Sequence, residues 1–158
     1  MTQLNSMENF KRDISYHALR GEDARILLTA HLSDHFHDIR MEVIADIDSL
    51  TITAARVNFI RYPSGDCPKA AGRMEQLIGF SIGKGLNRLL QNTFGGGRGC
   101  GNLRVMLQGL LPLAINVKAA AGYNDEQEIL DAIRERLTGS CAGYARRPEN
   151  EGVQCVEA

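Results

Sequence analysis

The chain has 158 residues, of which 44% are apolar and 23% are charged. A chain of this length buries roughly two thirds of its unfolded surface, so it fits one ordinary domain whose core needs no disulfides. This composition excludes disordered and fibrous classes. Eighteen Lys and Arg against 19 Asp and Glu give a net charge of -1, which argues against nucleic acid and membrane partners because both favour basic surfaces.

The N-terminal residues and the most apolar stretch both bear on location. Residues 1–12 are largely polar where a secretory signal would have an apolar run, so export is not expected. The most apolar stretch, residues 105–121, is interrupted by Pro112 and by polar residues. We predict a core helix there, too short to span a bilayer. The sequence thus predicts a cytoplasmic protein, and leaves a protein partner or a homo-oligomer open.

Short runs of alternating apolar and polar residues fill the first part of the chain. Residues 13–19 and 25–32 are two such runs, and the polar turn cluster between them indicates a hairpin. Residues 37–46 and 50–62 alternate again, as half-buried strands do. We therefore predict an antiparallel meander of about four strands.

A turn at residues 62–65 ends this pattern, and the apolar period then changes from 2 to about 3.6. Helices are predicted from that point, and Asp66 and Asn124 are their expected N-caps. They cover residues 66–79, 84–94, about 100–117 and 124–137.

The fold class predicted from these patterns is α+β, with a β-meander followed by about four helices packed on the sheet. A single domain is expected over residues 13–144, between a polar N-terminal segment, 1–12, and a polar tail, 145–158. The side chains predicted to face one another in its core are Ile39, Met41, Val43, Val57, Phe59, Leu77, Leu86, Leu103, Leu107 and Leu110.

Two of the four cysteines lie at predicted helix starts. Cys67 follows Asp66, and Cys100 follows Arg98 in a glycine-rich segment. A helix N-terminus and a neighbouring cation both stabilise a thiolate, and thiolates are good metal ligands or nucleophiles. The pattern indicates a shared thiol or metal site, although free cysteines are also common as small core residues.

A group of histidine and aspartate residues precedes the third predicted strand: His31, Asp34, His35, His37 and Asp38. Imidazole and carboxylate groups here could complete a cysteine-based metal site, and His37 is the first choice among the histidines. A histidine at a strand edge is also commonly solvated or simply hydrogen-bonded.

Four segments of the chain resemble a bacterial family catalogued as a domain of unknown function, number 2889. They are HDIRMEVIADIDSLTITAARV, YPSGDCPKAAGRMEQLIGFSIGKGLNRLL, GCGNLRVMLQGLLPLA and SCAGY, and the resemblance covers roughly residues 13–144. It implies shared residues at His37-Asp38, Cys67-Pro68, Gly99-Cys100 and Cys141. The family usually has His where this chain has Asn102, so a role for that His is not carried over. The resemblance implies no established activity.

A second resemblance, in architecture, is to iron-sulfur cluster scaffold proteins of the IscU and NifU kind. Their strands precede their helices, and their ligands come from a strand start, from the helix after the last strand and from a later helix start. The corresponding positions here are His37-Asp38, Cys67 and Cys100. The first cysteine of those scaffolds is absent from this chain.

Three functions remain open. The leading one is binding of zinc, iron or an iron-sulfur cluster by Cys67, Cys100 and His37 or Asp38, with Cys141 as a further candidate ligand. The second is a thiol enzyme, in which Cys100 is a nucleophile or persulfide carrier and His37 its base. The third is a non-catalytic partner subunit with structural cysteines. The spatial prediction is that Cys67 and Cys100 meet at one end of the sheet, beside His37 or Asp38.

Overall fold

The computed structural model describes residues 9–146 of the chain. The predicted α+β class is confirmed, because a four-stranded antiparallel sheet is followed by four α-helices. The chain divides into two compact units, residues 1–118 and 119–158, and each is described here by itself. Most of the predicted N-terminal segment and nearly all of the tail lie outside the described residues.

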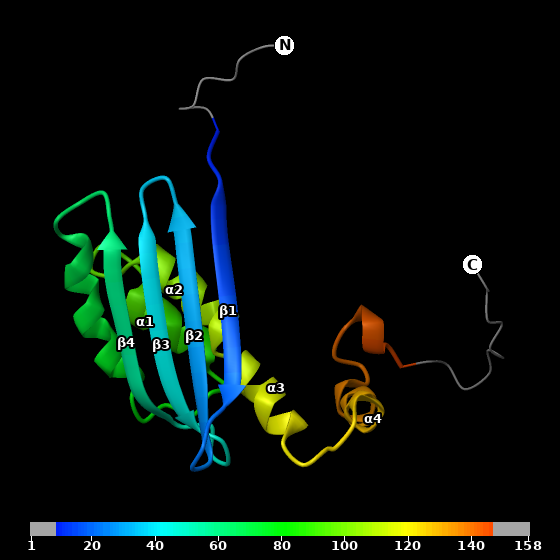
Figure 1. Cartoon of the computed structure of the whole chain (residues 1–158). Coiled ribbons are helices and arrows are strands. Elements are labelled where there is room, and N and C mark those ends of the chain that lie inside the picture. The colour runs from blue at the N-terminus through cyan, green and yellow to red at the C-terminus, as the bar shows by residue number, and fades with distance from the viewer. Residues whose placement is uncertain (1–8, 147–158) are drawn as a thin grey trace, which may run out of the picture. The chain divides into compact units, whose positions relative to one another are not determined.

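The sheet is an antiparallel meander in which every strand pairs with the next one along the chain (Figure 1). Its strands are β1 (Arg12–Arg20), β2 (Arg25–Asp34), β3 (Asp38–Asp46) and β4 (Ile52–Arg61). All four predicted strands are therefore present, with small shifts at their ends. The hairpin register aligns Tyr16 with Ala30 and carries the alternation of side chains across the sheet.

One face of this sheet forms the core. It carries the buried side chains Ile26, Leu28, Leu32, Ile39, Met41, Val43, Ala45 and Ile52. Helices of the first unit lie against that face, behind the sheet in Figure 1. The predicted core residues are buried except for Val57 and Phe59, which are half-buried because β4 is an edge strand.

The first predicted helix is a 3-10 helix, η2 (Cys67–Leu77). Its first turn already has the 3-10 pattern, because the Lys69 N–H donates to the Asp66 carbonyl (3.0 Å) and Pro68 has no N–H to donate. Asp66 is the N-cap residue, as predicted, but its side chain makes no capping hydrogen bond. Its carboxylate pairs with the Lys69 ammonium instead, at 2.5 Å.

Three α-helices follow: α1 (Leu86–Phe94), α2 (Gly101–Leu110) and α3 (Leu113–Ala120). The last two occupy the region predicted as one helix. Pro112 separates them, since it lacks the N–H that would continue the hydrogen-bond ladder, and the Ala114 N–H turns back to the Leu111 carbonyl instead (3.1 Å).

The helical stretch Gly101–Ala120 is long and apolar enough to cross a bilayer by length and composition alone, with a mean hydropathy of 1.2. It is longer than the apolar stretch at residues 105–121, which was predicted to be too short to span a bilayer. Core helices pass the same test, and Leu103, Met106, Leu107 and Leu110 of this stretch are fully buried in the protein. Their burial against the sheet supports the prediction of a core helix.

The second unit contains α4 (Glu126–Leu137) and the short η3 (Ala142–Tyr144). The N-cap of α4 is Asp125, not the predicted Asn124, because the Asp125 carboxylate accepts from the Glu128 N–H at 2.9 Å. Gly139 follows the helix with a φ of +80°, as a left-handed stop residue does.

Candidate thiol site

A glycine-rich loop, residues 95–99, leads from α1 to Cys100. Gly99 allows its tight course, since a Cβ at that position would lie 2.0 Å from the Phe94 carbonyl oxygen. Arg73 of η2 holds the loop in place by donating to the carbonyls of Thr93 (3.0 Å) and Arg98 (2.7 Å). The element that begins with Cys67 is thus tied to the loop that ends at Cys100.

Cys67 and Cys100 line the same pocket, which has a volume of about 490 Å³. Both residues are half-buried, and neither forms a disulfide. Two cysteines that are separated in sequence by η2 and α1 therefore lie at one pocket. This arrangement suits a ligand that is held by both sulfurs.

Positive charge gathers around this pocket. Lys69 and Arg98 contribute to its walls, and Cys100 is the N-cap residue of α2. The N-terminus of a helix adds a partial positive charge. Asp66 supplies the one carboxylate of the lining, and it is already paired with Lys69. An anionic group would be favoured beside the two sulfurs.

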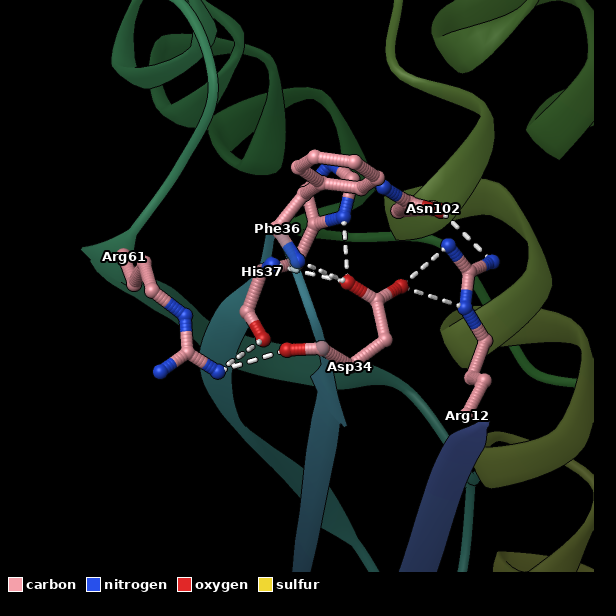
Figure 2. Close-up of polar contacts among 6 residues, drawn as sticks. All are labelled: Arg12, Asp34, Phe36, His37, Arg61 and Asn102. Carbon is pink, nitrogen blue, oxygen red and sulfur yellow. Dashed lines mark hydrogen bonds and ion pairs between the residues drawn. The ribbon is translucent and has the colours of Figure 1, made fainter. Parts of the chain in front are cut away.

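His37 lies at the β2–β3 turn and is held by Asp34. The His37 Nδ1 and the Asp34 carboxylate are 2.9 Å apart, and the same carboxylate accepts from the backbone N–H groups of Phe36 and His37. Arg12 pairs with its other oxygen at 2.5 Å (Figure 2). Burial by itself would raise the pKa of Asp34, but these hydrogen bonds outweigh it and hold that pKa far below its usual value.

The same network reaches the first turn of α2. Arg12 donates to the side-chain oxygen of Asn102 at 3.0 Å, and Asn102 follows Cys100 by two positions (Figure 2). From the end of β4, Arg61 donates to the carbonyls of Asp34 (2.6 Å) and His37 (3.2 Å). The histidine turn is therefore connected to the helix that begins beside the thiol pocket.

The predicted ligands His37 and Asp38 have polar partners of their own. Asp38 has its carboxylate 2.9 Å from His31 Nε2, on the sheet face opposite the core. Neither His37 nor Asp38 lines the thiol pocket, and Cys141 is an exposed residue of the second unit. Within residues 9–146, no three His, Cys, Asp or Glu side chains are close enough together to hold a metal ion.

Two contacts of this region could not be singled out from the sequence. Arg73 was one of many surface-type cations within a predicted helix, and its two acceptors are backbone carbonyls that carry no sequence signal. Asp34 stands among the histidines in the sequence, but its ion pair with Arg12 has no local sequence signal. Its partner Arg12 comes from another strand, and only the strand pairing Arg12↔Asp34 brings the two together.

The family model described as a protein of unknown function (DUF2889) matches residues 10–116, and the chain belongs to this family. The match includes Cys67, Cys100 and His37, and ends before Cys141. No curated protein matches the chain, and no solved structure does. The expected likeness to IscU and NifU therefore has no support among solved structures.

Proposed function

We propose that this member of the family binds zinc, iron or a transient iron-sulfur cluster through the thiolates of Cys67 and Cys100. One observation carries the proposal: the two cysteines line one pocket, with Arg73 holding their segments together. Thiolates select zinc, copper(I) and iron-sulfur clusters over harder ions. The positive lining would further favour the net negative charge of a metal-thiolate group.

Two thiolates leave a tetrahedral metal with two open positions. A metal bound in this way can be completed by solvent or by side chains of a partner protein, and it can be passed on, as a scaffold requires. His37 is the next candidate ligand within the chain. Asp34 engages its Nδ1 and leaves Nε2 for the metal, an arrangement typical of metal-ligating histidines. The turn would have to move for His37 to reach the pocket.

The test is metal analysis and an absorbance spectrum of protein purified without air. We expect zinc or iron near stoichiometry, or a visible cluster band, and loss of this signal in Cys67→Ser and in Cys100→Ser. Cys141→Ser is the matched control and should keep the metal. Metal-free wild-type protein, or metal retained by both single variants, would contradict the proposal.

A second candidate function is thiol chemistry at Cys100. The observation that favours it is the His37–Asp34 pair, since a base oriented by a carboxylate is the usual partner of a nucleophile. It predicts one fast-alkylating thiol in metal-free protein, slowed by His37→Gln. Equal, slow alkylation of Cys67 and Cys100 would argue against it. The purely structural function has less support, because neither cysteine is fully buried.

A further inference from the structure

The face of the sheet opposite the core carries two rows of polar side chains. Strand pairing aligns Ser15, His31, Arg40 and Asn58 in one row and His17, Thr29, Glu42 and Arg56 in the next. These eight residues line a groove of about 700 Å³. Small-molecule sites commonly have volumes of roughly 300–1,000 Å³. Helices α1 and α2 lie behind the sheet in Figure 1, against the face that carries the core. The polar rows belong to the other face.

The acidic groups at the groove are already engaged. Glu42 pairs with Arg56 at 3.3 Å. The carboxylate of Asp38, which is not part of the lining, lies 2.9 Å from Nε2 of the lining residue His31. Arg40 makes no ion pair among the residues that the structure describes. The charged side chains of the lining are Arg40, Arg56 and Glu42, so the groove has a net charge of +1 with neutral histidines, in a chain of net charge -1.

We propose that this groove binds a small molecule that carries a carboxylate or phosphate group, and that Arg40 anchors the group. Arg40 stands between His31 and Asn58 in its row, so its planar guanidinium has hydrogen-bonding groups on both sides. A free guanidinium matches the two oxygens of a carboxylate or phosphate in a bidentate contact. The Asp38 contact fixes the His31 ring, which reduces the cost of ordering it around a ligand.

The next row of the same face is apolar. Leu19, Leu27, Ile44 and Ala54 are aligned by the same strand pairing, and Leu19 is 56% exposed. An alkyl chain attached to the anionic group could cover this row. A longer alkyl carboxylate should therefore bind more tightly than acetate, because it removes more apolar surface from water.

The test is a titration of the uniformly ¹⁵N-labelled full chain with acetate, hexanoate and inorganic phosphate, followed by amide chemical shifts. We expect shifts at the two polar rows, and tighter binding of hexanoate than of acetate. Arg40→Gln should weaken binding roughly tenfold, the loss of one charge-assisted contact. Arg40→Lys keeps the positive charge but cannot form the bidentate contact, so its affinity should lie between those of the wild type and Arg40→Gln. Arg88→Gln on α1 is the control and should bind as wild type does.

Several outcomes would overturn the proposal: shifts confined to the glycine-rich loop, no shifts at all, or unchanged affinity in a folded Arg40→Gln variant. The amide spectrum itself reports whether each variant is folded. Binding of phosphate alone would assign the groove to phosphate esters, and binding of the carboxylates alone would assign it to organic acids. Neither result depends on metal at Cys67 and Cys100.

Discussion

The histidine turn and the thiol pocket lie at elements of the same unit, but their polar groups are used differently. Around Asp34 the partners satisfy one another: Arg12, His37 and two backbone amides all contact one carboxylate, which is 10% exposed. Near the pocket, Arg73 donates to two backbone carbonyls, and Cys67 and Cys100 are half-buried and form no disulfide. The turn holds its polar groups in a fixed geometry, whereas the pocket keeps two half-buried cysteines on a backbone that Arg73 holds in place.

The largest expected effect comes from the core that supports both regions. Leu107→Ala should lower the free energy of unfolding by roughly 2–5 kcal/mol, as large-to-small changes at fully buried sites do. Leu107 of α2 is completely buried, whereas Val105 on the same helix is 41% exposed. Val105→Ala is therefore the matched control. Urea unfolding of both variants measures the difference, and equal midpoints would show that α2 is not packed as described.

Asp34→Asn should have the second largest effect on stability, and it tests whether the histidine turn differs from the thiol pocket. It removes the charge that Arg12 and His37 share, and we expect a loss of roughly 1–3 kcal/mol in unfolding free energy. Asp66→Asn is the control at the thiol pocket. Its ion pair with Lys69 is about four fifths exposed on both sides, so it should have almost no effect. Similar losses of unfolding free energy in both variants would contradict the view that the turn is structural and the pocket is exposed.

Because of the Asp34 carboxylate, we expect the stability of the folded protein to depend on pH. The pKa of Asp34 is lower in the folded protein than in the unfolded chain, so its contribution is complete above the unfolded pKa of about 3.9. That contribution is lost as the pH falls below this value towards the folded pKa. The free energy of unfolding should be higher for the wild type than for Asp34→Asn at pH 7 and at pH 5. At pH 3 the difference between the two proteins should be smaller. A constant gap would contradict the assignment.

The sheet and its core could be predicted because their signals are local. Alternation within each strand decides which side chains face the helices, and Ile39, Met41 and Val43 are buried as their period requires. The 3-10 form of η2 was not predicted, because an apolar stripe at Ala70, Met74 and Leu77 fits either helix type.

The site was harder to predict than the fold. The sequence indicated that Cys67 and Cys100 start helices, and the structure places both at one pocket. It did not indicate that the adjacent residues His37 and Asp38 have different partners, Asp34 and His31. That separation depends on where β3 begins, and helix and strand ends are the least certain part of a sequence-based prediction.

Arg73→Gln should change stability less than Leu107→Ala or Asp34→Asn, but it should have the strongest effect on the pocket. Arg73 is half-buried and its guanidinium donates to two carbonyls of the segment that leads to Cys100. Its loss should cost about 1 kcal/mol in unfolding free energy, because a shorter amide reaches at most one carbonyl. The loop should then open, so that Cys67 and Cys100 no longer share a pocket, and the proposed metal binding should fall. Arg73→Lys keeps the charge without the two-pronged contact, and it should show the same loss of metal. Full metal content in both variants would show that the thiols meet without this clamp, and that the loop itself determines where Cys100 lies.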